Sequence, residues 1–205
     1  MDTATLTCQG FLDALASKSP TPGGGGASAL AAALGAALAT MVGHYTVGKK
    51  KYAAVEGDVK ALMERAEDLR AKLLALVDAD AAAFEPLSRA YAIPKDDPDR
   101  QEIMEKCLRD AAAVPMEIAR LACEAIELHR EMGEKGSVMV LSDVGTGVAF
   151  CRSALYGAAL NVKVNTKSMT DRACADAMNG SVDALLAEYG KLAEQVYERV
   201  YSRFV

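Results

Sequence analysis

Apolar side chains recur every three or four residues between Glu56 and Leu87, and this repeat limits the available folds more than any other feature. The spacing alternates four, three, four, three along the positions Leu62, Ala66, Leu69, Leu73, Leu76, Asp80, Ala83 and Leu87. Such a heptad pattern is typical of a helix that faces neighbouring helices. From residue 58 to 85 the helix would be roughly 42 Å long, and a globule of this chain length is only about that wide. The sequence therefore predicts an elongated helical bundle.

A second segment, from Pro20 to Val47, contains no Asp, Glu, Lys or Arg. It is long enough to span a bilayer, but Ala and Gly dominate it and it carries His44. This weak hydropathy favours a helix that is buried on all sides in a bundle, or that lies at a dimer interface, over a membrane span. The prolines and glycines of residues 19–26 predict a loop before this helix, which is expected to begin near Ala27.

The remaining pattern is also helical. Pro115 is expected to kink or break one helix, and residues 138–141 are read as a buried extended or helical segment, because no convincing partner strand exists. No repeat or linker divides the chain, so we expect one all-α domain over residues 1–205. The other helices are expected at Glu56–Pro86, Thr3–Ser17, Pro98–Ala113 with Asp97 as its cap, 115–132, 142–161 with Ser142 and Asp143 at its start, and 170–204.

The charge and cysteine content limit the expected binding partners and cellular location. The net charge is −5 and the strongest basic cluster is Lys49–Lys51, too short to follow a phosphate backbone, so nucleic acid is not expected as a partner. The five cysteines are scattered without a CxxC pair, which is typical of reduced, buried thiols in a cytosolic protein. Residues 1–3 lack the features of a signal peptide. We therefore expect a cytoplasmic protein.

The familiar metal and cofactor motifs are absent from the sequence. The two histidines are far apart, and there is no HExxH, Cys/His cluster, GxSxG, GxGxxG or P-loop lysine. An enzyme with this inventory is expected to work without metal or cofactor, through carboxylates, lysines and backbone amides at helix ends.

The loop Gly23–Gly26 has two readings. Glycines before a helix let backbone N–H groups approach a ligand. Alternatively, the glycines serve only as a linker between two helices. Four glycines lose much conformational entropy on ordering, which favours a ligand-binding loop.

Asp80, Asp143 and the lysine cluster can each be interpreted as structural or as functional. Asp80 lies in the heptad seam, where a lone charge is costly, so it is either a paired core residue or a carboxylate aimed into a cavity. Asp143 is read first as a helix N-cap. Lys49 and Lys50 are read first as a solvated helix end, and second as a landing site for a polyanionic tail.

Seven segments occur in an order that resembles the cyclodeaminase/cyclohydrolase family. That family includes the C-terminal domain of formiminotransferase-cyclodeaminase and stand-alone methenyltetrahydrofolate cyclohydrolases. The resemblance covers nearly the whole chain, although Gly26 stands where many members have serine. The segments are Ser19–Ala31, Gly48–Tyr52, Asp78–Phe84, Ile93–Lys95, Val114–Pro115, Ser142–Gly145 and Asn161–Asn165.

The resemblance implies an all-α homodimer, a tetrahydrofolate substrate and no further cofactor. The sequence has no formiminotransferase region, which favours a cyclohydrolase that converts 5,10-methenyltetrahydrofolate to 10-formyltetrahydrofolate. Asp143 is then the first candidate for the base that activates water, with Asp80 second. The expected substrate-binding residues are Lys49 and Lys50 for the glutamate tail, with Gly23, Gly24, Gly25, Ser19 and Asn165.

Three other functions stay open at this point. One is the cyclodeaminase reaction, which expels ammonia from a formimino group at the same bridge carbon. Another is a non-catalytic helical protein that dimerises through its heptads, with the glycine loop as a hinge. The third is an enzyme for a different small molecule on the same scaffold.

Overall fold

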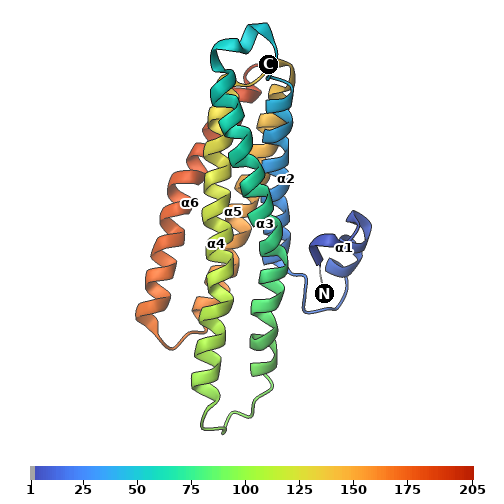
Figure 1. Cartoon of the computed structure of the whole chain (residues 1–205). Helices are drawn as coiled ribbons and strands as arrows, with labels where there is room; N and C mark the ends of the chain where they lie inside the picture. Colours follow the sequence, from blue (N-terminus) through green and yellow to red (C-terminus); the bar gives the residue numbers. More distant parts are fainter. Residues whose placement is uncertain (1–2) are drawn as a thin grey trace.

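The computed structural model describes residues 3–205, and every regular element within them is helical (Figure 1). The two longest helices, α3 and α4, each extend for roughly 50 Å at about 1.5 Å per residue. The prediction of an elongated all-α bundle is confirmed. The α-helices are α1 (Cys8–Leu15), α2 (Gly24–His44), α3 (Glu56–Ala90), α4 (Arg100–Lys135), α5 (Leu141–Lys167) and α6 (Arg172–Tyr201), and the 3-10 helices are η1 (Thr3–Thr5), η2 (Lys50–Val55) and η3 (Val138–Val140).

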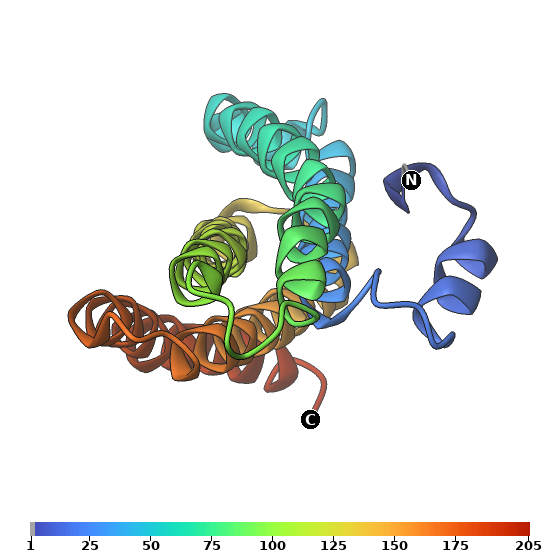
Figure 2. The same cartoon turned by 90° about the horizontal axis from the view of Figure 1, so that it is seen from below.

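The long helices are arranged around α4. Seen along the bundle, α3, α2, α5 and α6 form an arc beside α4 (Figure 2), and α4 contacts all four. Helix α2 packs between α3 and α5. In both views α1 lies to one side of α2 (Figures 1 and 2), and its buried Phe11 joins the core of the bundle.

The heptad seam of α3 forms as predicted in its first half, shifts by one residue at Val77, and returns to the predicted position at the buried Leu87. Leu62, Ala66, Leu69 and Leu73 are buried, but the next buried residue is Val77, and Leu76 is only half-buried. A straight helix has 3.6 residues per turn and drifts about 20° per heptad from a strict 3.5-residue repeat. The drift leaves Asp80 half-buried at the edge of the seam.

Helix α2 lies very close to α5. A Cβ atom on Gly35 would overlap Cys151 Sγ and would lie 2.9 Å from the carbonyl oxygen of Gly147. However, α2 is not buried on all sides, as one reading of the sequence predicted. Its neighbours lie on one side of it, and the opposite side is open, where Leu34 is 49% exposed.

Two helices, Gly24–His44 and Val138–Lys167, are long and apolar enough to cross a membrane by length and composition. Most of the first helix is buried inside the bundle. A core helix of a protein in water has the same length and composition. The thiols are free, and Cys123 and Cys151 are buried as predicted. Cys8 is exposed, and Cys107 and Cys174 are half-buried, so the expectation of buried thiols was wrong for Cys8 and holds only in part for the other two.

Several predicted helix starts were wrong because local capping decided them. The first helix begins at Cys8, since the side chain of Thr7 accepts the Gly10 N–H at 3.0 Å, and Thr3 is not its cap. Helix α4 begins at Arg100, because Asp97 Oδ1 accepts the Asp99 N–H at 2.9 Å in the preceding turn.

Tertiary packing overrode the sequence signals elsewhere. Helix α4 passes through Pro115 without a break, although a proline inside a helix costs about 3 kcal/mol. Pro115 is buried, and the packing of α4 against its neighbouring helices offsets this cost. Residues 138–140 form a 3-10 turn rather than a buried segment, with Val138 and Met139 exposed.

Candidate functional site

A pocket of about 210 Å³ lies where the start of α2 meets α3, α4 and α5. It combines one carboxylate, two side-chain amides and backbone groups with apolar surface. Its lining residues are Pro20, Thr21, Gly23, Gly24, Gly25, Asp80, Phe84, Ala111, Asn161, Val164 and Asn165. The pocket therefore brings together Asp80, the three glycines and Asn165, all of which were site candidates from the sequence.

The glycine loop forms the start of α2 and holds Asp80. Gly23 is the N-cap, and Gly24 to Gly26 form the first helical turn, so the prediction of a wholly non-helical loop up to Ala27 was wrong. Asp80 Oδ2 accepts the N–H of Gly26 at 2.9 Å. A Cβ atom on Gly25 would overlap the Asp80 carboxylate. Glycine is required here because the backbone must approach a side chain of α3, a demand that neither sequence interpretation, a ligand-binding loop or a linker, included.

The protonation of Asp80 is set by two opposing effects. Burial raises the pKa of the Asp80 carboxyl above its ordinary value of 3.8, and the hydrogen bond from Gly26 N–H offsets part of this rise. A carboxylate with a raised pKa is a stronger base than an exposed one. No positively charged side chain lines this pocket within residues 3–205.

Two asparagines from one face of α5 form the opposite wall. Asn165 Nδ2 donates to the carbonyl oxygens of Ala111 and Asn161, both at 3.0 Å, which fixes α5 to α4. Asn161 Nδ2 donates to Gly157 at 2.8 Å. A Cβ atom on Gly24 would lie 3.1 Å from Asn161 Nδ2, so α2 and α5 meet directly at the pocket.

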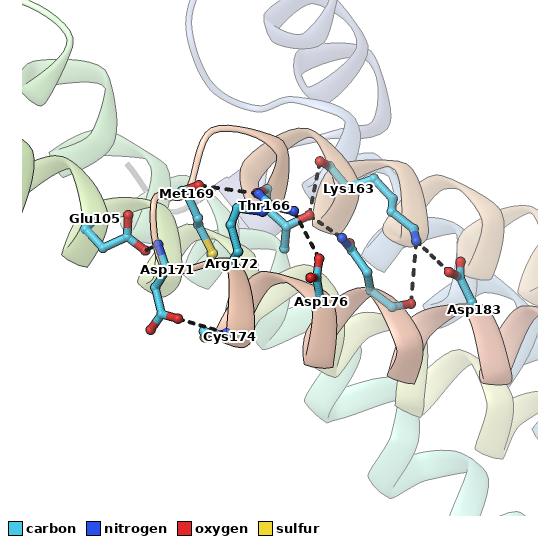
Figure 3. A network of polar contacts seen from close by, with 10 residues as sticks. Glu105, Lys163, Thr166, Met169, Asp171, Arg172, Cys174, Asp176 and Asp183 are labelled. Atoms are coloured by element: carbon cyan, nitrogen blue, oxygen red, sulfur yellow. Dashed lines mark hydrogen bonds and ion pairs between the residues drawn. The ribbon is translucent and has the colours of Figure 1, made fainter.

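The turn from α5 to α6 is held by a polar network (Figure 3), which fixes the end of α5 beyond the asparagines. Glu105 of α4 accepts hydrogen bonds from Thr170 N and Oγ1 at 2.6 and 2.7 Å. Asp171 caps α6 by accepting the Cys174 N–H at 3.0 Å. Lys163 pairs with Asp183 of α6 at 2.7 Å. The pocket wall is therefore anchored on α4 and α6.

Sequence reasoning missed six of the lining residues, which are Pro20, Thr21, Phe84, Ala111, Asn161 and Val164. A signal existed for two of them: Asn161 lies one helical turn before Asn165, and Phe84 lies one turn after Asp80, so each pair shares a helix face. Both belong to segments that carried the family resemblance. Phe84 gives the pocket an apolar wall opposite polar groups, an arrangement suited to a flat ring with N–H donors.

The other predicted residues lie outside the pocket. Ser19 is exposed just before it, with its hydroxyl donating to the Thr21 carbonyl at 2.7 Å. Lys49 and Lys50 follow α2 at the far end of the bundle, where Lys49 Nζ lies 3.7 Å from Met139 Sδ.

Asp143 lies at that far end too. It is within the first turn of α5, whose N-cap is Val140, so the N-cap prediction for Asp143 was wrong. Along α5, Asp143 is roughly 27 Å from Asn161 at about 1.5 Å per residue. One subunit therefore does not bring Asp143 and Asp80 together.

Within residues 3–205 no three His, Cys, Asp or Glu side chains are grouped as ligands for a metal ion. The pocket offers a base, backbone amides and an apolar wall. This donor set suits proton transfer and hydrogen bonding to a polar heterocycle. A reaction without metal or cofactor stays a prediction, which activity after chelator treatment and dialysis would test.

The known proteins that are similar to this chain belong to one family. The family profile described as formiminotransferase-cyclodeaminase matches residues 7–184. A methenyltetrahydrofolate cyclohydrolase of Methylorubrum extorquens is 43% identical over 96% of this chain and 97% of its own length. The mouse formimidoyltransferase-cyclodeaminase is 33% identical over 88% of this chain, which spans 34% of that protein.

A solved structure has the same fold. The crystal structure of a formiminotetrahydrofolate cyclodeaminase from Thermotoga maritima superposes with a TM-score of 0.91. It is 27% identical, and the match covers 98% of both chains.

Proposed function

The chain belongs to the formiminotransferase-cyclodeaminase family, and we propose that it hydrolyses 5,10-methenyltetrahydrofolate to 10-formyltetrahydrofolate. Near full-length similarity to a methenyltetrahydrofolate cyclohydrolase supports this reaction. The observation that carries it in this chain is the half-buried Asp80 carboxylate, held by Gly26 N–H beside two asparagines in one pocket.

The substrate's one-carbon bridge is a cation shared between N5 and N10. In the proposed mechanism Asp80 takes a proton from water as the water oxygen bonds to the bridge carbon, which becomes a neutral carbinol. The carbinol hydroxyl then loses its proton as the C=O bond forms. The bond from carbon to N5 breaks, and N5 keeps the electron pair and is protonated. One water is consumed and one proton is released overall.

Each lining group has a distinct part in this mechanism. The anionic Asp80 stabilises the cationic bridge before attack and is the base in reach of it. The asparagine amides and the backbone of Gly23–Gly25 are positioned to hydrogen-bond the pterin ring, and Phe84 packs against its face. We assign the base to Asp80 rather than to Asp143 of the same subunit, because the latter lies at the other end of α5.

A second candidate is the cyclodeaminase reaction. The full-length fold similarity to the Thermotoga maritima cyclodeaminase favours it. The same pocket would protonate the departing amino group of a 5-formimino substrate while N10 attacks the formimino carbon. The two reactions share the bridge carbon and therefore the same requirement for Asp80.

The decisive experiment is to mix the purified protein with 5,10-methenyltetrahydrofolate and follow loss of the methenyl chromophore against the uncatalysed rate. Accelerated loss with 10-formyltetrahydrofolate as product would support the proposal. No acceleration, combined with ammonia release from 5-formiminotetrahydrofolate, would assign the cyclodeaminase instead. Inertness towards both would reject both.

We further propose a cytoplasmic homodimer without a membrane anchor. Five free thiols are compatible with a reducing compartment, and the burial of most of α2 favours a bundle in water. Fractionation of cells that produce the protein, with immunodetection in the soluble and membrane fractions, would test the location. Sedimentation of the purified protein would test the dimer.

A further inference from the structure

A second cavity, of about 420 Å³, lies at the other end of the bundle from Asp80, where Figure 1 marks the C-terminus. The ends of α4 and α6, the start of α5 and the 3-10 helices η2 and η3 form its walls. Its volume is within the roughly 300–1,000 Å³ typical of ligand pockets. Leu141 in its wall is about 30 Å along α5 from Asn161 in the first pocket, at about 1.5 Å per residue. The two cavities of one subunit are therefore separate.

Positive charge dominates this second cavity. Four cationic side chains line it against one carboxylate, and they are Lys51, Arg130, Arg199 and Arg203 against Glu134. The chain as a whole has a net charge of −5, so the cavity is opposite in sign to the molecule. A concave site with an excess of one charge attracts ligands of the other charge, which here are anions.

Glu134 holds two of the four cations in place. Its Oε1 lies 2.9 Å from Arg199 Nη1 and 3.7 Å from Arg130 Nη1. Arg130 Nε also donates to Glu127 at 2.7 Å. Because a guanidinium has five N–H donors, both arginines keep donors beyond those that the carboxylates use. Two guanidinium groups fixed side by side in this way are preorganised to bind an oxyanion.

The other two cations, Lys51 and Arg203, form no ion pair within residues 3–205. Both are exposed, and Lys51 Nζ lies 5.4 Å from the centre of the Tyr52 ring. A single unpaired charge is common on a protein surface. Two of them in one cavity wall with the arginine pair repel it and each other, and a bound anion would remove this repulsion.

Neutral donors also face the cavity. Tyr52 Oη accepts the Val138 N–H at 3.1 Å, so its own proton is left for a ligand. That hydrogen bond lowers the pKa of Tyr52, which makes its O–H a stronger donor. The N-cap of α5 is Val140, whose side chain cannot accept the N–H groups of the first turn, and such N–H groups favour negative charge. Asp143 belongs to this turn but does not line the cavity.

The rest of the wall is apolar. Val196 and Val200 of α6 are buried in it, and Phe204 lines it with 63% of its surface exposed. Free phosphate would leave this apolar surface in water. An anion carried on an apolar or aromatic group would cover it and gain the free energy of that burial.

We propose that this cavity binds a small oxyanion with more than one negative charge, carried on an apolar or aromatic group. A phosphate ester has this chemistry, and so does an aromatic compound with clustered carboxylates. Arg130 and Arg199 bind the oxyanion through their guanidinium N–H groups, and Lys51 and Arg203 neutralise it. Phe204 packs against the carrier. This function goes beyond the proposed reaction and does not depend on it.

Calorimetric titration of the full chain with phenyl phosphate tests the site. The wild type should bind phenyl phosphate, and the affinity should fall as salt is added. Lys51→Gln together with Arg203→Gln should weaken this binding about 10-fold. Because neither residue pairs with a carboxylate, the double substitution leaves no acid unpaired, and circular dichroism should show unchanged helicity.

The matched control is Lys18→Gln together with Lys191→Gln. It removes the same charge from two exposed positions that do not line the cavity, so it should bind phenyl phosphate like the wild type. An equal loss in both double variants would mean that surface charge alone attracts the probe, and this would overturn the site. A wild type that binds neither phenyl phosphate nor benzenetricarboxylate would also overturn it.

The same titration separates the two sources of the anion. Tighter binding of phenyl phosphate than of benzenetricarboxylate would support the site and assign it to phosphate esters, and the reverse order would support the site and assign it to carboxylates. Phenyl phosphate should also bind more tightly than inorganic phosphate, and Phe204→Ala should remove that advantage. An advantage that persists in Phe204→Ala would contradict the role of the apolar wall.

Binding is measured here without turnover, so this result is independent of the methenyl assay. A protein that does not hydrolyse the methenyl substrate but binds phenyl phosphate would reject the proposed function and keep the anion site. Asp80→Asn should bind phenyl phosphate like the wild type. A changed affinity in that variant would assign the probe to the first pocket and would overturn the second site.

Discussion

The two ends of the α2–α5 pair differ in chemistry although the same two helices form both. At one end the start of α2, the end of α5 and Asp80 of α3 enclose a pocket with backbone and amide contacts. At the other end Asp143 and Lys49 lie near the bundle surface, with Lys49 Nζ 5.8 Å above the ring of Tyr45. The first end has a half-buried base and no cation among its lining residues, and the second has cations without that base. Residues that a sequence pattern assigns to one site therefore need not meet within one subunit.

Removing the base at the pocket end should have the largest effect. Asp80→Asn keeps the shape of the side chain but cannot take a proton, so we expect kcat to fall by about 10³-fold. Because burial raises the pKa of Asp80, wild-type activity should rise with pH as this carboxyl ionises. That limb of the pH–rate profile should disappear in the variant.

Asp68→Asn is the control for this change, because Asp68 is exposed on the same helix and pairs with Lys72. It should leave kcat unaltered. An Asp80→Asn enzyme within a few-fold of the wild type would refute the assignment of the base.

Displacing the same carboxylate without removing it should have the next largest effect. Gly25→Ala introduces a Cβ atom that overlaps Asp80, so the side chain must rotate away from Gly26 N–H. We expect about a 10²-fold decrease in kcat, measured with the methenyl substrate. The control Gly57→Ala adds a Cβ atom to the first turn of α3 with no atom within 4 Å. Equal activities of the two variants would show that the position of Asp80 is not critical.

The stability of the buried core between the two ends should decrease in acid. His129 is fully buried, its Nε2 lies 3.0 Å from the carbonyl oxygen of Gly35, and burial lowers the pKa of His129 to about 4. Between pH 6.5 and 4 the unfolded chain binds a proton that the folded protein excludes. The free energy of unfolding should therefore fall as the pH falls through this window, by about 3 kcal/mol from this residue.

Urea unfolding at several pH values measures this effect. His129→Gln should flatten the dependence between pH 6.5 and 4, whereas the exposed His44, altered to Gln, should not. A slope that is the same in the wild type and in His129→Gln would assign the acid sensitivity to other groups.

The smallest effect is expected at the cationic end. Lys49→Gln together with Lys50→Gln should raise KM for a polyglutamylated folate about five-fold, which corresponds to about 1 kcal/mol for exposed charges. The change should shrink in high salt, with kcat unaltered. Lys72→Gln, on the exposed side of α3, serves as the control, and a KM insensitive to the double substitution would remove these lysines from substrate binding.

The sequence alone determined the class of fold and much of the pocket. The heptads of α3 and the uncharged segment of α2 predicted a long helical bundle, because periodic burial is a local property of a helix. The ordered motifs identified Asp80, Gly23–Gly25 and Asn165, which the structure places in one pocket. It did not identify Asn161 as a wall residue, and it assigned Asp143 and Lys49 to the same site.

Only the tertiary structure decided which of these residues meet. Whether Asp80 faces a cavity depends on the drift of a straight helix relative to its heptads and on Gly25, which lets α2 approach α3. The separation of Asp143 from Asp80 follows from the antiparallel register of α2 and α5. Contacts between helices depend on side chains that are distant in sequence, so a local pattern predicts that a helix has a face but not what covers it.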